Sequence, residues 1–229
     1  VPVGVPEPER ALSLAAAAGY TLPADDEPGL RLRDDLAPPS PTGAAVPRSA
    51  PTVTGTAPEH PPAGPAGDYV VVHPGSSVPA RACPADRCAE IVAALVADGW
   101  RVLVTGGPDE RDLTARVAAG GGTDLGGATD LAGLARLISG ARCLVVGNTG
   151  PAHLAAAVGT PVVSLFAPTV PFGQWVPYRV PVVRLGDAGA ACRDTRAAVC
   201  PVAGHPCLSG LDPGAVVAAV RLLAPTPPD

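Results

Sequence analysis

Apolar residues along this chain fall into short continuous runs that alternate with longer segments of helical periodicity. A short apolar run that ends at Gly or Pro predicts a strand buried on both faces, which is typical of parallel sheets covered by helices. We expect such strands at residues 69–73, 101–105, 124–125, 143–146, 161–166 and 180–185.

The segments between these strands carry apolar residues at intervals of three and four, as an amphipathic helix does. Pro84 suits the first turn of the first such helix. Its apolar stripe consists of Cys88, Ile91, Val92, Leu95 and Val96. A later helix has Leu131, Leu134, Ala135 and Ile138 on one face. We expect three further helices: one that begins at Asp109, one that ends at Val158, and one over 213–223. Strands alternating with helices predict an α/β fold, a Rossmann-like parallel sheet with helices on both faces.

The pattern changes outside this region and suggests three parts. The first part, residues 1–36, is too short to form a domain of its own. Within it, residues 7–19 predict one helix that ends at Gly19. Residues 37–67 hold nine prolines among small polar residues, which is typical of an extended or disordered linker. We therefore expect the folded domain to occupy residues 68–225, with a Cys- and Gly-containing loop region at 187–211.

Composition removes several classes of function. The chain has 229 residues, 47% of them hydrophobic, and a net charge of −5, which disfavours a nucleic-acid partner. No apolar run approaches the roughly 18 residues of a transmembrane helix, and the start lacks the pattern of a signal peptide. We expect a cytoplasmic protein.

Candidate chemistry lies in the turns that follow four predicted strands, because ligands of open parallel sheets bind at the carboxyl ends of the strands. These turns are 73–77 with Arg81 beyond them, 105–110, 129–130, and 148–150 with His153 one turn into the next helix. Glycine-rich turns and helix N-termini bind anions, and the hydroxyls of Ser76, Ser77 and Thr149 can donate to phosphate oxygens. Neither the P-loop pattern nor Gly-x-Gly-x-x-Gly after the first strand is present.

Taken together, the motifs His-Pro-Gly-Ser-Ser at 73–77, Thr-Gly-Gly-Pro-Asp-Glu at 105–110 and Asn-Thr-Gly-Pro-Ala-His-Leu-Ala at 148–155 resemble glycosyltransferase family 9. Its best-known members are the ADP-heptose:lipopolysaccharide heptosyltransferases. The resemblance covers roughly residues 69–223 and implies the C-terminal half of an inverting, metal-independent GT-B enzyme. It implies no cofactor, an ADP-heptose-like donor substrate, and a glycan or lipid-linked acceptor that would bring the enzyme to a membrane surface.

The resemblance also implies roles for individual residues. Ser76, Ser77 and Arg81 match positions at the donor diphosphate, where the family usually has lysine in place of Arg81. Glu110 matches the acid that holds the ribose, and Thr129 falls beside the base. The phosphate- and sugar-facing turn corresponds to Asn148, Thr149, Gly150 and His153. Of these residues, Arg81 and His153 are the candidates for catalysis.

Two positions depart from the family pattern. Asn148 stands where the family usually has aspartate, so an amide replaces a charge and the donor identity or the contacts to sugar hydroxyls can differ. Cys83 stands where the family has tryptophan, which removes a packing anchor.

The family also places the acceptor site and the general base in an N-terminal domain, and residues 1–36 correspond only to the tail of such a domain. Three origins stay open: a fragment, a truncated gene product and a donor-binding remnant. Besides an enzyme, the sequence therefore allows an inactive nucleotide-sugar-binding module. A sugar-nucleotide epimerase would need a different set of acids facing the sugar.

The six cysteines leave one further question. Cys88 and Cys143 lie at predicted packing positions. Cys192, Cys200 and Cys207, with His205 nearby, could supply three thiolates and an imidazole to zinc, but no Cys-x2–4-Cys pair is present. Free thiols, favoured by a cytosolic setting, or one disulfide are the alternatives.

Overall fold

The structure is a computed structural model that describes residues 5–24, 26, 29–32 and 69–224. The linker predicted at 37–67 lies outside the described residues. The division of the chain at residues 36 and 68 therefore stays a prediction.

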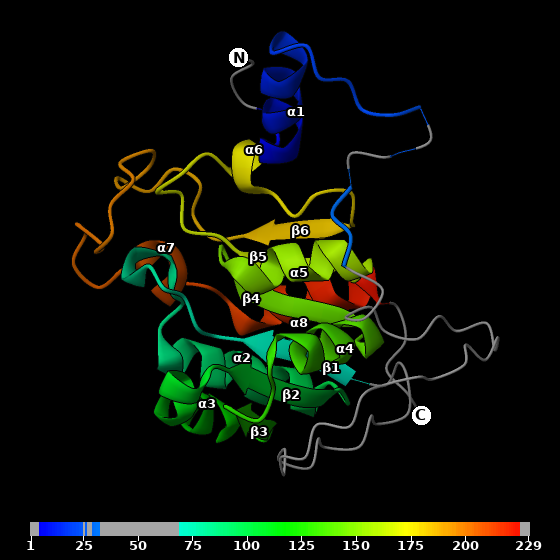
Figure 1. Ribbon diagram of the computed structural model, residues 1–229. Coiled ribbons are helices and arrows are strands. Elements are labelled where there is room, and N and C mark those ends of the chain that lie inside the picture. Colours follow the sequence, from blue (N-terminus) through cyan, green and yellow to red (C-terminus); the bar gives the residue numbers. More distant parts are fainter. Residues whose placement is uncertain (1–4, 25, 27–28, 33–68, 225–229) are drawn as a thin grey trace, which may run out of the picture.

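Six parallel strands form one sheet in the order β3-β2-β1-β4-β5-β6 (Figure 1). The strands are β1 (Tyr69–His73), β2 (Arg101–Gly106), β3 (Thr123–Gly126), β4 (Cys143–Gly147), β5 (Val162–Leu165) and β6 (Val182–Leu185). In the register of the central strands, Val72 of β1 lies between Val104 of β2 and Val145 of β4. All six predicted strands are thus confirmed, within one or two residues at their ends.

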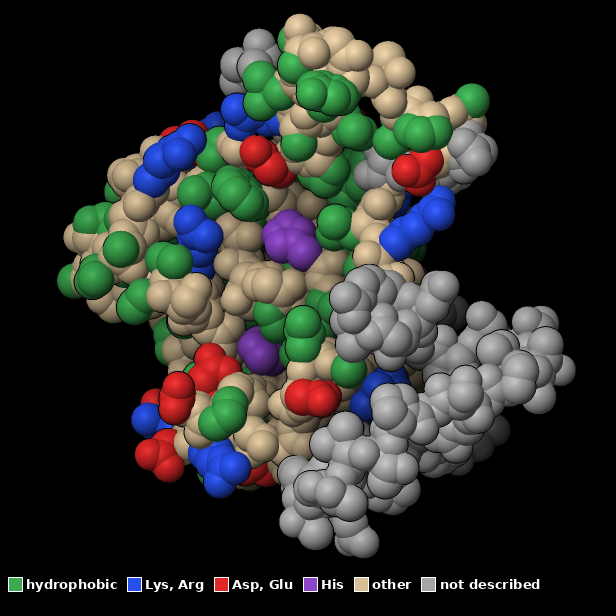
Figure 2. All heavy atoms as spheres, in the orientation of Figure 1, with side chains coloured by type: hydrophobic (Ala, Val, Ile, Leu, Met, Phe, Trp, Pro, Cys, Tyr) green, Lys and Arg blue, Asp and Glu red, His purple; other side chains and the backbone are tan. Residues whose placement is uncertain are grey.

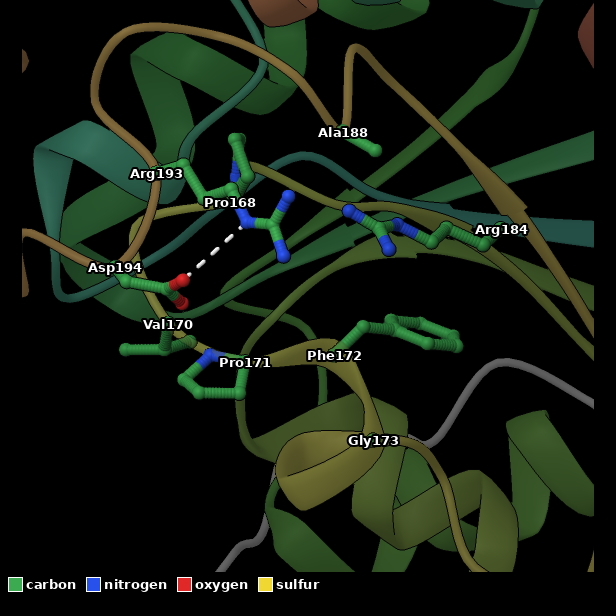
Figure 3. A pocket seen from close by; sticks show the side chains of 9 residues that line it. All are labelled: Pro168, Val170, Pro171, Phe172, Gly173, Arg184, Ala188, Arg193 and Asp194. Carbon is green, nitrogen blue, oxygen red and sulfur yellow. Dashed lines mark hydrogen bonds and ion pairs between the residues drawn. The ribbon is translucent and has the colours of Figure 1, made fainter. Parts of the chain in front are cut away.

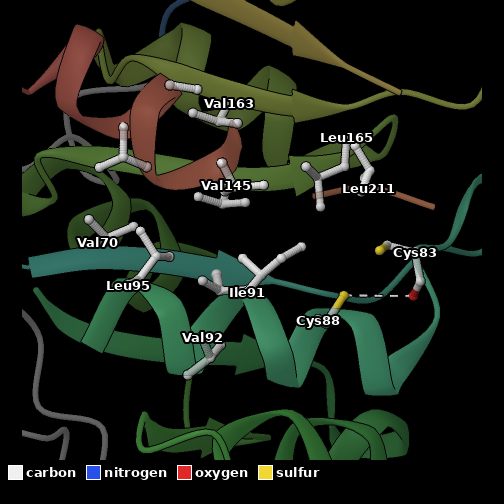
Figure 4. Close-up of a cluster of buried hydrophobic side chains, with 14 of the residues drawn as sticks. Val70, Cys83, Cys88, Ile91, Val92, Leu95, Val145, Val163, Leu165 and Leu211 are labelled. Carbon is white, nitrogen blue, oxygen red and sulfur yellow. Dashed lines mark hydrogen bonds between the residues drawn. The ribbon is translucent and has the colours of Figure 1, made fainter. Parts of the chain in front are cut away.

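Helices cover both faces of this sheet, as a parallel sheet requires. One layer consists of α2 (Ala85–Ala97), α3 (Arg111–Ala118) and α8 (Pro213–Leu223), and the other of α4 (Leu131–Gly140) and α5 (Gly150–Val158). The first layer closes the larger core cluster, where Val70 and Val145 of the sheet pack with Ile91 and Leu95 of α2 (Figure 4). On the opposite face, Val71 and Leu144 pack in a second cluster with Ile138 of α4. The predicted Rossmann-like α/β fold is therefore confirmed.

Four details of the helix predictions are wrong. Leu131, placed on the buried face of α4 by its spacing, is 64% exposed because it is the first residue of the helix. Val96, at the end of the α2 stripe, is 37% exposed. Pro84 is the N-cap of α2 rather than part of its first turn, and the segment after Asp109 begins as a 3-10 turn (Pro108–Glu110) before α3.

Short elements lie where the sequence predicted loops. These are a 3-10 turn at Pro79–Arg81, α6 (Phe172–Trp175) and α7 (Pro206–Ser209). Their length of one turn gives too few residues for a periodic pattern.

The predicted N-terminal helix is present as α1 (Glu7–Ala17), and Gly19 follows its end at φ +89°, where glycine is favoured. No residue of α1 is buried. The helix lies beside α6 (Figure 1), where Gln174 Nε2 donates to Glu7 Oε2 at 2.7 Å and Tyr178 donates to Glu9 at 3.1 Å. Two polar contacts therefore join α1 to the segment around α6.

On the face of the described residues that Figure 2 shows, acidic and basic side chains are intermingled. No helix among residues 5–24, 26, 29–32 and 69–224 combines the length and apolar character needed to span a bilayer.

Candidate functional site

The strand order reverses between β1 and β4, and this topological switch point is where open α/β sheets bind ligands. The turn after β1 and the turn after β4 both lie there. The 3-10 turn that ends at Arg81 packs against the end of β4, since a Cβ built on Gly147 would lie 3.0 Å from the Arg81 carbonyl oxygen. The fold thus brings Arg81 and the turn after β4, about 70 residues apart, together at the switch point, which is where open α/β sheets have their ligand crevice.

Glu110 links the first and second motifs. Its Oε2 accepts a hydrogen bond of 2.7 Å from the backbone N–H of Gly107, at the start of the 3-10 turn after β2. Its other oxygen, Oε1, lies so close to Gly75 that any Cβ there would overlap it. The carboxylate therefore lies between the turns that follow β1 and β2. Its role toward a ligand stays a prediction.

Two buried hydrogen-bond donors near the switch point have no partner among the residues that the structure describes. They are Nε of the half-buried Arg81 and Nδ2 of Asn148, a residue that is only 6% exposed. Buried polar groups are nearly always hydrogen-bonded, because an unpaired one costs free energy. Arg81 and Asn148 belong to the two segments that meet at the contact between the Arg81 carbonyl and Gly147.

The N-terminus of α5 opens at the same crevice. Thr149 is its N-cap in an extended conformation, and its hydroxyl makes no capping hydrogen bond. A Cβ on Gly150 would meet no atom within 4 Å, so the protein's own packing does not require glycine there. Partial positive charge at a helix N-terminus, together with open space at Gly150, makes this end of α5 suited to an anion.

His153 lies one turn into α5 and is half-buried. Burial lowers its pKa below the ordinary value for histidine. At neutral pH the imidazole is therefore uncharged and can offer a ligand one N–H donor and one acceptor nitrogen.

The two serines of the first turn differ in their surroundings. Ser76 Oγ donates to the Val78 carbonyl at 3.2 Å and accepts from the Val78 N–H at 3.3 Å, so the turn itself uses this hydroxyl. Ser77 is exposed. Ser77 is consequently the better placed of the two for contact with a ligand.

Thr129 lies furthest from the switch point among the predicted residues. It follows β3, which is separated from β1 by β2. Its neighbour Asp130 caps α4 by accepting from the Gly133 N–H at 2.6 Å. Thr129 thus shares the carboxyl edge of the sheet with the other residues, but only an extended ligand could touch both it and the β4 turn.

The sequence placed His73 in the first motif without a role of its own. His73 is buried at the end of β1, and its Nδ1 lies 3.1 Å from the Thr105 hydroxyl of β2. Burial lowers the pKa of His73, although the charge of Glu110 opposes the shift. The uncharged His73 and Thr105 therefore lie close enough to Glu110 to feel its charge. The sequence signal for this pair was a polar residue at the end of each of two apolar runs.

The cysteines do not form a metal centre in the part of the chain that the structure describes. No three or more His, Cys, Asp or Glu side chains are grouped there so as to hold a metal ion, and all six thiols are free. Burial and the neighbouring Cys192 and Cys200 raise the pKa of Cys207 to about 12, which keeps the thiol protonated. The zinc interpretation of Cys192, Cys200, Cys207 and His205 is therefore not supported.

Cys83, in place of the family's tryptophan, is buried with Cys88 in the larger core cluster (Figure 4).

Known proteins share both the sequence and the fold. Over 108 residues, the chain is 34% identical to lipopolysaccharide heptosyltransferase 3 of Escherichia coli, and over 111 residues it is 36% identical to lipopolysaccharide heptosyltransferase 1 of Pseudomonas aeruginosa. These matches cover 44% and 48% of this chain and 32% and 31% of the relatives. The chain thus spans about a third of the length of the curated relatives that it matches.

The structure of E. coli ADP-heptose lps heptosyltransferase II superposes with a TM-score of 0.58 at 21% identity, covering 68% of this chain and 46% of that one. This likeness agrees with the Rossmann-like fold. The sequence profile of glycosyltransferase family 9 (heptosyltransferase) matches residues 36–203, which is most of the chain. The chain therefore belongs to glycosyltransferase family 9.

Proposed function

We propose that this chain carries the nucleotide-sugar site of a heptosyltransferase-like glycosyltransferase. The donor would be a nucleoside-diphosphate sugar similar to ADP-heptose, and the acceptor a hydroxyl of a glycan or lipid-linked glycan. The proposal rests on the family membership and on the names of the matched relatives, which are lipopolysaccharide heptosyltransferases.

The observation that carries the donor site is the pair of unpartnered buried donors, Arg81 Nε and Asn148 Nδ2, at the switch point. Diphosphate oxygens are strong acceptors and bring the negative charge that a guanidinium and a helix N-terminus favour. We therefore place the diphosphate between Arg81 and the start of α5, where the Thr149 hydroxyl and the N–H groups at Gly150 would also donate to it.

These positions suit a reaction with inversion. The acceptor oxygen would attack the anomeric carbon from the face opposite the diphosphate, forming the new C–O bond as the bond to the leaving phosphate breaks. The hydroxyl proton would pass to a general base, which the family places in its N-terminal domain. Negative charge then grows on the leaving group, and donors already fixed in the crevice stabilise that charge. Arg81 would meet it with a full positive charge and His153 with a neutral N–H.

The nucleoside would extend from the diphosphate toward β2 and β3. Glu110 would accept from the two ribose hydroxyls, and its position between the turns after β1 and β2 supports this role. Ser76 and Ser77 would line the passage from ribose to diphosphate. Thr129, beyond β2, would border the base.

We also propose that the reaction takes place in the cytoplasm. A lipid-linked acceptor would bring the protein into contact with a membrane surface.

Calorimetric titration of the protein with ADP, UDP and GDP in the presence of EDTA tests this proposal. At least one nucleotide should bind without added metal, and Arg81→Ala should weaken that binding. Arg101→Ala is the matched control, because Arg101 is exposed at the amino end of β2, the opposite end of the sheet. A folded sample that binds none of the three nucleotides would refute the donor site.

A further inference from the structure

A second pocket, of about 380 Å³, lies beyond the carboxyl ends of β5 and β6. Its walls come from the segment that leads into α6, from β6 and from the loop around Arg193 (Figure 3). None of the residues that line it belongs to the crevice between β1 and β4. The sequence motifs gave no sign of this pocket.

Arg184 of β6 is fixed at the pocket by two aromatic rings. Its guanidinium carbon lies 5.2 Å from the centroid of the Phe166 ring and 4.8 Å from that of Phe172. The two rings themselves meet edge to face, with their centroids 4.9 Å apart. Aromatic faces attract a cation but offer no lone pair for its N–H groups. Accordingly, Arg184 Nε is buried and has no hydrogen-bond partner.

A second arginine faces it across the pocket. The guanidinium groups of Arg184 and Arg193 point toward each other (Figure 3), and no ion pair joins Arg184 to any residue in the described ranges. Arg193 has one acidic partner, since its Nε donates to Asp194 Oδ2 at 3.3 Å. The three side chains thus carry a net charge of +1. Burial and the charge of Arg193 lower the pKa of Arg184, which is the electrostatic cost that a bound anion would remove.

Backbone hydrogen bonds hold the two walls together. The N–H of Asp194 donates to the Pro168 carbonyl at 2.9 Å, and the N–H of Arg196 donates to the Thr169 carbonyl at 2.8 Å. Asp194 and Arg196 adopt φ values of +59° and +56°, which are uncommon for residues other than glycine and persist only where the surroundings enforce them. The loop therefore presents Arg193 and Asp194 in a defined position.

We propose that this pocket binds the phosphate or carboxylate group of a sugar-sized ligand, at a site separate from the nucleotide crevice. Two guanidinium groups pointing at one space match the oxygens of such a group. The cavity is larger than one oxyanion needs and falls in the range of about 300–1,000 Å³ that small-molecule sites occupy, which leaves room for an attached ring. The ring would lie beside the crevice, because β5 is the neighbour of β4.

The test is calorimetric titration of the full chain with inorganic phosphate, glucose 6-phosphate, acetate and glucuronate, each with and without saturating ADP. We expect each sugar-borne anion to bind more tightly than its bare counterpart, with an affinity that ADP does not reduce. Arg184→Gln should weaken this binding at least about tenfold, because it removes one charge-assisted partner. Arg101→Gln, at the other end of the sheet, is the matched control and should bind as the unmodified protein does.

Asp194→Asn separates a binding role from a structural one. Asparagine tolerates the left-handed backbone of Asp194 and removes the competing negative charge, so anion affinity should rise several-fold while the fold is kept. Unchanged or weaker binding in Asp194→Asn would overturn the proposal. So would anion binding that ADP abolishes, that folded Arg184→Gln retains in full, or that is limited to inorganic phosphate. Should Arg184→Gln fail to fold, Arg193→Gln takes its place with the same expected loss.

Discussion

Gly75, in the turn after β1, lies in direct contact with the carboxylate of Glu110 from the turn after β2, and a Cβ at position 75 would overlap Glu110 Oε1. Residues 35 positions apart thus form one surface because β1 and β2 are neighbours in the sheet. Glycine at position 75 is needed for the close approach of a side chain, and the position of that side chain decides what the crevice can bind.

Replacing Gly75 with alanine should displace the Glu110 carboxylate. Overpacking of this kind costs roughly 1–3 kcal/mol, and we expect the lower part of that range because the end of a half-exposed side chain can move. Thermal denaturation measures the loss. Gly107→Ala is the matched control, since its Cβ would lie 3.7 Å from Glu110 Oε2, an ordinary contact, and should leave the melting temperature close to that of the unmodified protein. Equal melting temperatures for both variants would contradict the contact.

Arg81→Ala should weaken binding of ADP much more than binding of adenosine. A charge-assisted hydrogen bond contributes about 1.5–3 kcal/mol, and its proposed partner is a phosphate oxygen that adenosine lacks. Calorimetric titration of both ligands gives the two losses. Similar losses for ADP and adenosine would show that Arg81 does not face the diphosphate.

Glu110→Gln should have the opposite selectivity. Glutamine keeps an oxygen that can accept from the Gly107 N–H, but it loses the charge that strengthens hydrogen bonds from the ribose hydroxyls. We expect adenosine to bind about fivefold more weakly, a difference of about 1 kcal/mol, while pyrophosphate binding is unchanged. A loss of pyrophosphate affinity in this variant would assign Glu110 to another part of the ligand.

Asn148→Asp should place a carboxyl group where only 6% of the side chain is exposed. If Asn148 faces the donor, the negative charge should weaken diphosphate binding at least about tenfold near neutral pH. Asn148→Ser, a small neutral replacement, is the control. Unchanged ADP affinity in a folded Asn148→Asp variant would make Asn148 a turn residue only.

The buried His73 should make the protein less stable in acid. Burial lowers the folded-state pKa of His73 below the unfolded value of about 6.5. Below that pH the imidazole is therefore protonated more readily in the unfolded chain than in the folded one. The stability is fully present above pH about 6.5 and is lost as pH falls below it.

His73→Asn keeps a polar group beside Thr105 but cannot titrate there. The dependence of the unfolding free energy on pH below about 6.5 should become shallower by up to about 1.4 kcal/mol per pH unit. Denaturant unfolding at pH 8 and at several lower pH values measures both slopes. Identical slopes for the variant and the unmodified protein would show that His73 is not protonated on unfolding.

Local sequence was sufficient for the six strands and the longer helices of this fold. The apolar runs around Val71, Leu103 and Leu144 predicted buried strands, and the spacing of Ile91 and Leu95 predicted the buried face of α2; the structure confirms both. Such predictions succeed because strand and helix periodicity act over a few residues. They failed at Leu131 and Val96, since the position of a helix end relative to the sheet decides whether an apolar residue there is covered.

The sequence also located the turns that carry the candidate site, because polar and glycine-rich residues follow apolar strands at Ser76, Glu110 and Thr149. It could not show that Arg81 packs against the end of β4, that Glu110 lies against Gly75, or that Arg184 and Arg193 face one pocket. These relationships depend on the order of the strands and on backbone hydrogen bonds between distant loops, such as that from Asp194 to Pro168. The sequence by itself therefore determined which residues form the six strands and the longer helices, since those preferences are local, but not the one-turn elements such as α6 and α7. Only the tertiary structure decided which turns meet, because pairing between strands far apart in the chain is fixed by packing of the whole sheet and its helices.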